Sequence, residues 1–456
     1  MTLDRIKVSM LLGIMAGYLI LAYGFMLVRV PPSSFGVPLG ELLLLVVLVG
    51  INLPRVLARI GTTVVLTPFL VWWGWGFGRL AFDTADRGFW ALRDATQLIE
   101  SLFLIVGFSL AAAPDATPRL IRWLRWIIII SCIYGLLYVF ADQIIALSPK
   151  LSGASGQAVP IFGSFAMTGT MLLWGAFACL IERAEHPKAR MLQTLVAGFL
   201  VAFAVVVIQM RTTYLQLFVL SWLLLVVRPR ALGRLGTSLP VLLLLLLIIT
   251  AFDLRISGRL TSEISLSFFW NHLQAIFGVG AAGQGAVAEA AGGVPLRLHW
   301  WTRLYEQLTA DPITLLTGLG YGIPLTDFRD QLGVTTREPH NSVISVVARL
   351  GLLGFIAWIW MQFELFRVGL HTYRTNRRRG HSDGAHLPLL VLAFAVLTLI
   401  GCVGEDNMEK PYYAIPYYAL WGFVLRISYR LRAETPESRP TYSTHQLANA
   451  AQSRQP

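Results

Sequence analysis

The sequence predicts an all-α polytopic membrane protein. Hydrophobic residues make up 55% of the 456 residues and charged residues only 14%, whereas about a quarter of the residues in a soluble domain are charged. The mean hydropathy is +0.63, and many apolar runs reach the ~20 residues that a helix needs to cross a bilayer. We therefore expect about twelve transmembrane helices and one long loop outside the cytoplasm that carries short interfacial helices.

The apolar runs place the expected spans in order along the chain. The first run is too long for the apolar segment of a signal peptide and lacks a small-residue cleavage site, so we expect it to remain as a span. Arg211 interrupts an otherwise continuous apolar stretch and separates two neighbouring spans. The expected spans are 8–29, 37–54, 62–81, 92–113, 123–145, 160–182, 193–210, 212–228, 239–253, 348–367, 387–404 and 411–427.

The positions of Arg and Lys predict the orientation. With the N-terminus in the cytoplasm, every second loop is rich in Arg and Lys and the loops between them are poor in both, as the positive-inside rule requires. The net charge of +12 then reflects loops that face anionic lipid, so we expect no nucleic-acid partner. The expected division is N-terminal transmembrane helices over 1–253, a large loop over 254–340, C-terminal helices over 341–432 and a disordered cytoplasmic tail over 433–456.

The long loop changes character along its length. Its middle, "GVGAAGQGAVAEAAGG", is rich in Gly and Ala, and we expect it to be flexible. After Pro295 the text "LRLHWWTRLYEQL" predicts a helix on which Trp300, Trp301, Leu304 and Leu308 share one face with Arg297. We expect this helix to lie at the membrane surface, with its tryptophans at the depth of the lipid headgroups.

Several classes of chemistry have no support in the sequence. The three cysteines all lie in apolar runs, which predicts small core residues and neither a disulfide set nor a metal site. The chain contains no GxxxxGK nucleotide loop, no DxD pair, no HExxH and no CxxC. We therefore expect no ATP hydrolysis, no nucleotide-sugar transfer, no cofactor and no metal.

His340 is the first candidate for catalysis. Of the eight histidines only His272, His299 and His340 fall outside the cytoplasm in this topology. His340 precedes "NSVISVVARL", a predicted helix that Asn341 or Ser342 would cap. The positive end of that helix disfavours imidazolium, so we expect a neutral ring that can act as a general base. The alternative is a histidine that only caps the helix or lies at the headgroups.

Arginines supply the other candidates. Arg211 lies at a turn between two spans, where a cation is costly unless it is paired or lines a cavity. Arg297 would face the membrane surface, where a lipid diphosphate lies, and two or three arginines can hold such a group. For each of them the alternative is a side chain that snorkels to the headgroups. Further arginines that could reach the same pocket are Arg337, Arg303, Arg259 and Arg255; Arg349 is expected to be buried and paired.

Acidic residues near the span ends leave several roles open. Arg93, Asp94 and Glu100 begin the fourth expected span, where a structural pair of an arginine with a carboxylate is the favoured interpretation. Asp142, Glu405 and Asp406 lie at outer span ends, where carboxylates could bind sugar hydroxyls.

Four stretches together resemble the O-antigen ligase/polymerase superfamily. "PHNSVISVVARLGLLGF" resembles its His-Asn helix followed by Gly-Leu-Leu-Gly, and "RLHWWTRLYEQLTADPITLLTGLGYG" resembles its Arg-Leu-x-x-Trp helix and glycine turn. "QMRTTYLQL" stands in the place of the family's Ser-Arg turn, although Met210 replaces the serine. "PIFGSFAMTGTMLL" resembles the Gly-Thr-Phe entry to an earlier span. The strongest similarity covers roughly residues 195–365.

The resemblance implies metal-independent transfer of a glycan from undecaprenyl diphosphate, at the periplasmic face of a bacterial inner membrane. The long loop would then be periplasmic, and the acceptor would be another lipid-linked repeat unit, as for a Wzy-type polymerase of exopolysaccharide, O-antigen or capsule, or lipid A-core, as for a ligase. By matching position, Arg211 and Arg297 would contact the diphosphate and His340 would be the base. We count Arg337, Arg303, Arg259 and Asn341 as candidate substrate contacts, and membrane lipids and a chain-length regulator as candidate partners.

A solute transporter is the alternative from another class. Transporters of this size usually contain inverted repeats and helices that break near the middle of the membrane. The sequence contains no evident repeat, and its polar cluster lies in a loop, so we rank the transporter below both the polymerase and the ligase.

Overall fold

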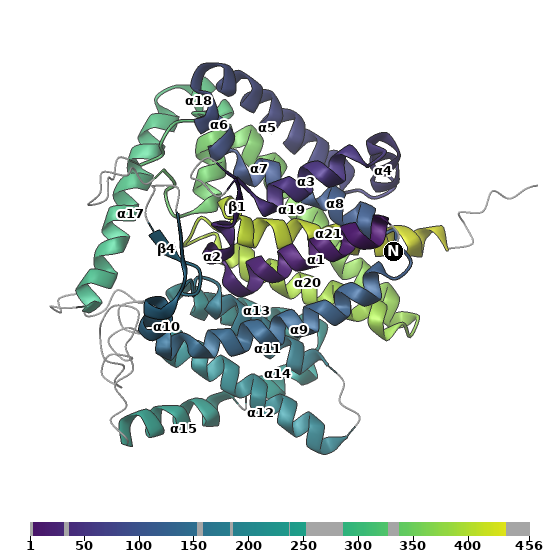
Figure 1. Ribbon diagram of the computed structural model, residues 1–456, viewed down its shortest axis with the longest axis vertical. Helices are drawn as coiled ribbons and strands as arrows, with labels where there is room; N and C mark the ends of the chain where they lie inside the picture. The colour runs from purple at the N-terminus through teal and green to yellow at the C-terminus, as the bar shows by residue number, and fades with distance from the viewer. Residues whose placement is uncertain are drawn as a thin grey trace, which may run out of the picture.

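The computed structural model describes residues 3–31, 36–152, 158–182, 186–236, 238–251, 286–326 and 337–434 (Figure 1). These residues are almost entirely helical, and their strands form only two short antiparallel hairpins. The expected all-α fold is therefore confirmed. The expected flexible stretch from 278 to 285, the candidate Arg259 and the polar tail after Glu434 lie outside the described residues.

The N-terminal part contains one bent pair of helices and one interrupted span. Its elements are α1 (Leu3–Leu21), α2 (Tyr23–Met26), β1 (Arg29–Val30), β2 (Val37–Pro38), α3 (Leu39–Val49), α4 (Leu53–Ile60), α5 (Leu66–Arg87), α6 (Phe89–Asp94), α7 (Thr96–Glu100) and α8 (Phe103–Leu110).

Two expected spans are wrong as continuous helices. Between α3 and α4 the chain bends by 97°. Helix α3 ends before Gly50. The side chain of Asn52 accepts a hydrogen bond from the backbone N–H of Arg55 at 3.1 Å and so caps the start of a new helix, α4. The expected span at 92–113 is divided among α6, α7 and α8.

The middle of the chain continues with α9 (Ala116–Leu136), η1 (Leu137–Phe140), α10 (Ala141–Leu147), β3 (Lys150–Ser152), β4 (Ala158–Pro160), α11 (Thr168–Ile181), α12 (Pro187–Phe203), η2 (Ala204–Ile208), α13 (Arg211–Val227), α14 (Pro229–Leu235) and α15 (Ser238–Ala251). A π-helical turn, η2, ends α12, and Gln209 then adopts a left-handed conformation (φ +50°). The predicted break before Arg211 is thus confirmed.

The C-terminal part begins with α17 (Ala286–Thr309) and continues with α18 (Pro312–Thr317), α19 (Ser342–Arg378), α20 (Ser382–Gly401), η3 (Asn407–Glu409) and α21 (Pro411–Ala433). Helix α17 starts within the Gly/Ala-rich stretch that was expected to be flexible, and this expectation is wrong from Ala286 onward. Alanine is the strongest helix former, which accounts for the difference.

Helix α21 forms the centre of the bundle. Nearly all of its residues are buried, and it packs against α8, α1, α20 and α19 (Figure 1). Its closest approach is to α8, where a Cβ on Gly422 would lie 2.5 Å from the backbone nitrogen of Phe108. Small residues let the backbones of two helices approach in this way inside a membrane.

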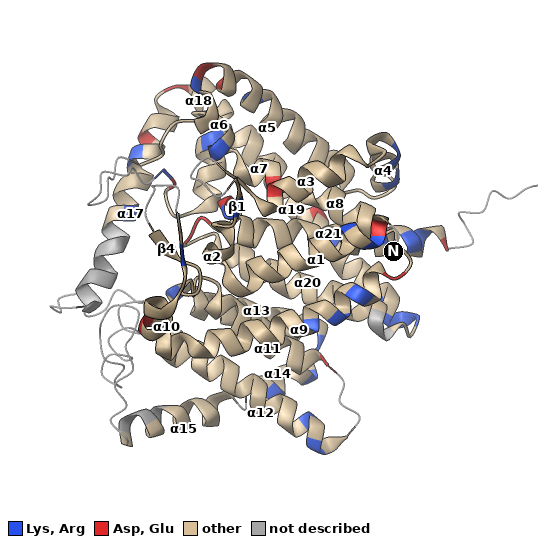
Figure 2. Cartoon of the chain, in the orientation of Figure 1, with Lys and Arg blue, Asp and Glu red and all other residues tan. Residues whose placement is uncertain are grey.

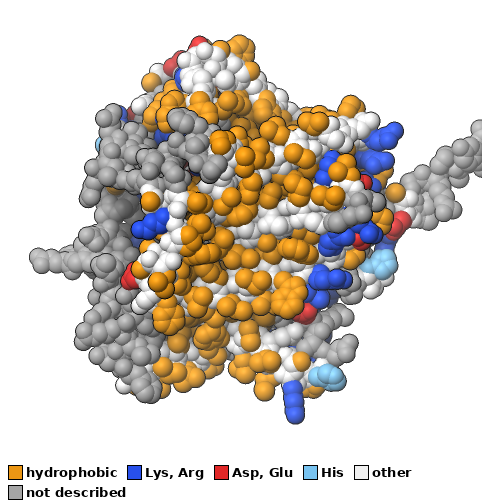
Figure 3. All heavy atoms as spheres, viewed as in Figure 1, with side chains coloured by type: hydrophobic (Ala, Val, Ile, Leu, Met, Phe, Trp, Pro, Cys, Tyr) orange, Lys and Arg blue, Asp and Glu red, His pale blue; other side chains and the backbone are white. Residues whose placement is uncertain are grey.

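The outer surface is that of a membrane protein. Hydrophobic side chains cover the middle of the visible face in Figure 3. Exposed apolar residues of the described chain include Val46 of α3 and Ile133 of α9. Among the described residues, four helices are long and apolar enough to cross a membrane, or five if the bent pair counts as one span. The expected count of twelve, and the division of the chain at 253, 340 and 432, stay predictions.

Candidate functional site

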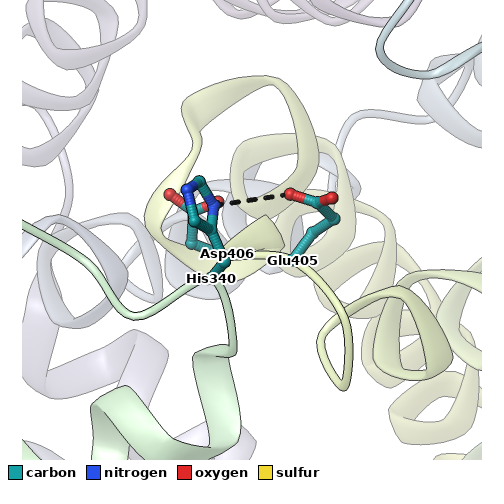
Figure 4. Close-up of side chains that lie close together, drawn as sticks. All are labelled: His340, Glu405 and Asp406. Carbon is teal, nitrogen blue, oxygen red and sulfur yellow. Dashed lines mark ion pairs between the residues drawn. The ribbon is translucent and has the colours of Figure 1, made fainter. Parts of the chain in front are cut away.

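The turn between α20 and α21 brings together two of the predicted site residues. Nδ1 of His340 lies 3.6 Å from Oε2 of Glu405 and 3.5 Å from Oδ1 of Asp406 (Figure 4). Nη2 of Arg297 donates a hydrogen bond to the other oxygen of Glu405, Oε1, at 3.3 Å, and Nη1 donates to the carbonyl oxygen of Gly404 at 2.6 Å. His340 and Arg297, which are 43 positions apart in the sequence, therefore share one carboxylate.

The first turn of α19 fixes this arrangement. Oδ1 of Asn341 accepts the hydrogen bond of the Ile344 N–H at 3.0 Å, which caps the helix as predicted. The side-chain nitrogen of Asn341 donates a hydrogen bond to the carbonyl oxygen of Val403 at 2.8 Å. The backbone N–H of Ser342 donates to the carbonyl oxygen of Cys402 at 3.0 Å. The helix start is thus tied directly to the turn that carries Glu405 and Asp406.

His340 occupies a restrained position. Its φ of +53° lies in the left-handed region, which costs free energy for a residue with a side chain. The carbonyl oxygen of Pro339 accepts a hydrogen bond from Nε1 of Trp301 at 2.9 Å, and the ring of Trp300 lies 6.1 Å from the imidazole. Helix α17 therefore holds the segment that presents the histidine.

The expectation of a neutral His340 is wrong. The carboxylates of Asp406 and Glu405 raise its pKa from 6.5 to about 9, although partial burial of the ring acts in the opposite direction. Two neighbouring negative charges outweigh the positive end of α19. The imidazole is therefore protonated near pH 7 in the absence of substrate.

The expected orientation of α17 is also wrong. Its face with Trp300, Leu304 and Leu308 is buried at 4%, 3% and 5% exposure, and the same face directs Arg297 towards the turn at Glu405. In Figure 1 the helix runs along one side of the bundle. The apolar face of α17 packs against other parts of the protein, where Leu304 contacts Leu325 and Ala348. It therefore does not face lipid.

Cations balance the carboxylates of the turn. Nζ of Lys410 lies 2.7 Å from Oδ1 of Asp406. Although burial opposes the effect, Lys410 and His340 lower the pKa of Asp406. The ligand atoms of His340, Glu405 and Asp406 lie within 4.8 Å of one another, close enough to hold a metal ion. A divalent cation there would have to displace the contacts of Lys410 and Arg297, so this donor set suits an anionic or neutral ligand better.

A cavity of about 170 Å³ opens beside the turn. Its size suits a small ligand, since pockets for drug-sized ligands begin at roughly 300 Å³. Thr170, Thr213, Gln216 and Asn407 line it with hydroxyl and amide groups, and Gly169 allows Thr213 to approach closely, since a Cβ there would lie 2.5 Å from Oγ1 of Thr213. Its wall also contains Glu405, Lys410, Met210, Thr212, Tyr412 and Tyr413.

Arg211 begins α13 at the wall of this cavity, between the lining residues Met210 and Thr212. Its side chain is half-buried, and within the described part of the chain it forms no ion pair or hydrogen bond through that side chain. The π-helical turn and the left-handed Gln209 set the helix start that presents it. Both features are uncommon and concentrate at functional sites.

The other candidate arginines lie elsewhere or are already paired. Arg337 forms a two-pronged contact with Asp94, at 2.9 and 2.6 Å, and stacks on Trp90. Arg349 is buried and paired, as expected, with Glu338 at 2.9 Å and with Asp94 at 3.1 Å. Asp94 thus pairs with these two arginines and not with its neighbour in the sequence. Arg303 lies on α17, and its role as a substrate contact stays a prediction, as do those of Arg337 and Asn341.

Helix α19 contains a break that the loop "GLGYG" supports. At Gly351 the backbone leaves the helix (φ +65°), which frees the carbonyl groups before it. The backbone N–H of Leu319 donates a hydrogen bond to the carbonyl oxygen of Ala348 at 2.7 Å, and that of Gly320 donates to the carbonyl oxygen of Arg349 at 3.0 Å. Nε1 of Trp75 donates to the carbonyl oxygen of Leu350 at 2.9 Å. The "GLGYG" loop therefore caps the short helix that begins after His340.

Three features of this site do not follow from the sequence pattern. Glu405 and Asp406 lie at an expected outer span end, but their contact with His340 joins residues 65 positions apart in the case of Glu405 and leaves no local signal. Lys410 and the cavity next to it were not predicted. The motif "EDNMEK", with its charges between two apolar runs, was the available signal.

Comparison with known proteins adds one match. Residues 196–359 match a family model described as O-antigen ligase. No curated protein matches the chain. The matched range contains Arg211, Arg297 and His340 and ends just after the break at Gly351.

Proposed function

We propose that the chain is a membrane glycosyltransferase of the O-antigen ligase/polymerase superfamily, because residues 196–359 match the family model described as O-antigen ligase. It transfers a glycan from an undecaprenyl-diphosphate-linked donor to a glycan acceptor, and its first candidate reaction is the polymerisation of lipid-linked repeat units. The observation that carries the proposal is the contact of Arg297 and His340 with the two oxygens of Glu405. This contact supports a joint role for the two residues, Arg297 as a cation for the diphosphate and His340 as a base for the acceptor.

His340 is the proposed base. Its Nδ1 faces Glu405 and Asp406, which leaves Nε2 for an acceptor hydroxyl. Carboxylates at one ring nitrogen orient an imidazole and stabilise the imidazolium that forms on proton transfer. In the neutral form of the ring, Nε2 takes the hydroxyl proton, the oxygen bonds to the anomeric carbon, and the bond from that carbon to the diphosphate oxygen breaks. The electron pair leaves with the lipid diphosphate.

Arg297 and Arg211 are the proposed contacts of the leaving group. A guanidinium has five N–H donors. Two of those of Arg297 form hydrogen bonds with Gly404 and Glu405, so three remain for phosphate oxygens. Arg211 has no partner of its own among the described residues and begins a helix, whose N-terminal dipole also favours an anion. Neither role requires a metal ion, because the charge of the leaving group is offset by fixed cations.

The polar cavity is the proposed place of the sugar next to the reacting bond. Hydroxyl and amide groups of its lining are of the kind that bind sugar hydroxyls, and it shares Glu405 with the base. The mixture of one carboxylate and one lysine leaves little net charge in the wall, which favours a neutral ring over the diphosphate itself.

The proposed orientation places this site at the periplasmic face of an inner membrane. Lys and Arg gather at the opposite ends of the helices, near the N-terminus, α4 and the start of α12 (Figure 2). By the positive-inside rule those ends face the cytoplasm, so the turn that carries Glu405 would face outward. A chain-length regulator remains a candidate partner.

A ligase that transfers the glycan to lipid A-core is the second candidate, which the description of the matched family favours. The two can be separated with purified protein in proteoliposomes. The lipid-linked oligosaccharide of the native cells is supplied alone or with lipid A-core. Longer lipid-linked chains from the donor alone indicate a polymerase, and glycan on lipid A-core indicates a ligase. Donor that stays intact in both mixtures contradicts the glycosyltransferase proposal.

A further inference from the structure

A second cavity is lined by residues of α19 that begin about one helical turn after Ser342. It has a volume of about 10 Å³ and lies between α5, α7, the first half of α19 and η3. Its lining includes Trp72, Gln97, Arg349 and Glu409. This volume corresponds to about one water-sized sphere.

Four buried polar atoms at this cavity have no hydrogen-bond partner in the described part of the chain. They are Nε1 of Trp72, Nε2 of Gln97, Nε of Arg349 and Oε1 of Glu409. The side chains of Trp72, Gln97 and Arg349 are more than nine-tenths buried, with relative exposures of 1%, 7% and 3%. A buried donor or acceptor without a partner destabilises the folded state, so these four groups favour a ligand that forms hydrogen bonds with them.

We propose that this cavity is a binding site for one ordered water molecule. A water molecule accepts two hydrogen bonds and donates two. Two of the N–H groups of Trp72, Gln97 and Arg349 can donate to it at once, and Oε1 of Glu409 can accept one of its hydrogens; Asp94 and Glu338, which also line the cavity, offer further acceptors. Buried waters usually form about three hydrogen bonds with such otherwise unsatisfied groups.

The charges around the cavity favour water over an anion. Three carboxyl groups line it, and the guanidinium of Arg349 already contacts two of them, Glu338 and Asp94. Burial, together with the nearby Glu338 and Asp406, raises the pKa of Glu409. When protonated, this carboxyl group can both donate a hydrogen bond to a neutral molecule and accept one from it. A chloride ion would face the same carboxyl groups in a space that admits only a water-sized sphere.

The water would join the helix-break region to the candidate site. The second oxygen of Glu409, Oε2, accepts a hydrogen bond from Oγ of Ser342 at 2.5 Å, and Oγ of Ser342 accepts one from the backbone N–H of Met408 at 3.1 Å. Through Glu409 the water links α5 and α7 to the start of α19, directly after His340. This inference does not depend on the proposed function.

Two measurements test the site on the full chain. In a cryo-EM map of the protein in lipid nanodiscs, at a resolution that shows other buried waters, we expect one density peak within hydrogen-bond distance of at least three of the four atoms. An empty cavity in such a map overturns the proposal. A peak that disappears when gluconate replaces chloride indicates an anion and overturns it as well.

A filling substitution gives an independent test. Val346 lines the cavity, so Val346→Ile places a methyl group there, and Val343→Ile on the same helix is the matched control. If water occupies the site, Val346→Ile displaces it and lowers the midpoint of thermal unfolding by several degrees relative to the control. A raised midpoint means that the methyl group filled an empty void, which contradicts the proposal.

Discussion

Arg297 and His340 contact opposite oxygens of the same carboxylate: Glu405 receives Nη2 of Arg297 on Oε1 at 3.3 Å and faces Nδ1 of His340 with Oε2 at 3.6 Å. Glu405 comes from a different turn, which the start of α19 holds through Asn341 and Ser342. One acidic residue therefore sets the distance between the proposed base and one proposed diphosphate contact.

Substitution of this acidic residue is expected to impair both partners. Glu405→Gln keeps the shape of the side chain but removes the charge, so we expect transfer to fall by about 10- to 100-fold, the usual cost of losing a residue that orients a functional group. The measurement is glycan transfer in proteoliposomes at equal protein levels. Glu182→Gln, which removes an exposed pair with Arg125, is the control. Equal activity of the two variants would contradict the role of Glu405.

The pH dependence of transfer tests the protonation state of His340. A base works only when it is deprotonated, and the pKa of His340 is raised to about 9. We expect kcat/KM to rise tenfold per pH unit below this value and to level off above it. Asp406→Asn removes a negative charge beside the ring, so the level region should begin at a lower pH. A profile that falls as pH rises through 9 would mean that the cationic form is the active one, and would rule out the base.

The pair of Asp94 with Arg337 is expected to stabilise the fold. Asp94 is 2% exposed in its side chain and serves two arginines, Arg337 and Arg349. Removal of one partner from a buried ion pair costs about 3–5 kcal/mol, so Asp94→Asn should clearly lower the midpoint of thermal unfolding in detergent. Glu182→Gln, in an exposed pair with Arg125, should change it little. If both variants melt alike, Asp94 is not structural, and Arg337 is then free to bind substrate as first predicted.

The break in α19 is expected to tolerate only glycine. Gly351 has a φ of +65°, and a Cβ there would collide with the backbone of Leu316. We expect Gly351→Ala to lower the yield of folded protein sharply, since both strain and collision act at this position. Gly74→Ala is the control, because a Cβ at Gly74 meets no atom within 4 Å. Normal folding of Gly351→Ala, measured by size-exclusion chromatography, would contradict the break.

The sequence predicted the helical class and the main site residues for identifiable reasons. Long apolar runs predict helices in a membrane, and isolated charges such as Arg211 and His340 stand out against them. The bend at Asn52 was missed because a polar cap inside an apolar run changes hydropathy little. The direction of α17 was missed because an amphipathic face covers protein as well as it covers lipid, and only the contact of Arg297 with Glu405 decides between them.

The protonation state of His340 could not be predicted from the sequence for a related reason. The charge of an imidazole depends on neighbours from distant segments, here Asp406 and Glu405, and local helix position is the weaker influence. Long-range contacts of this kind leave no periodic pattern in a sequence.

The most direct test of the account is glycan transfer by His340→Ala and His340→Gln in proteoliposomes. Product chains and released undecaprenyl diphosphate are measured together, at equal insertion and equal midpoint of thermal unfolding. The account predicts a loss of at least about 100-fold for both variants, the low end of a general base's contribution, with the donor still bound through Arg297 and Arg211. Transfer at the wild-type rate by either variant, from protein that inserts and folds normally, would contradict the central claim.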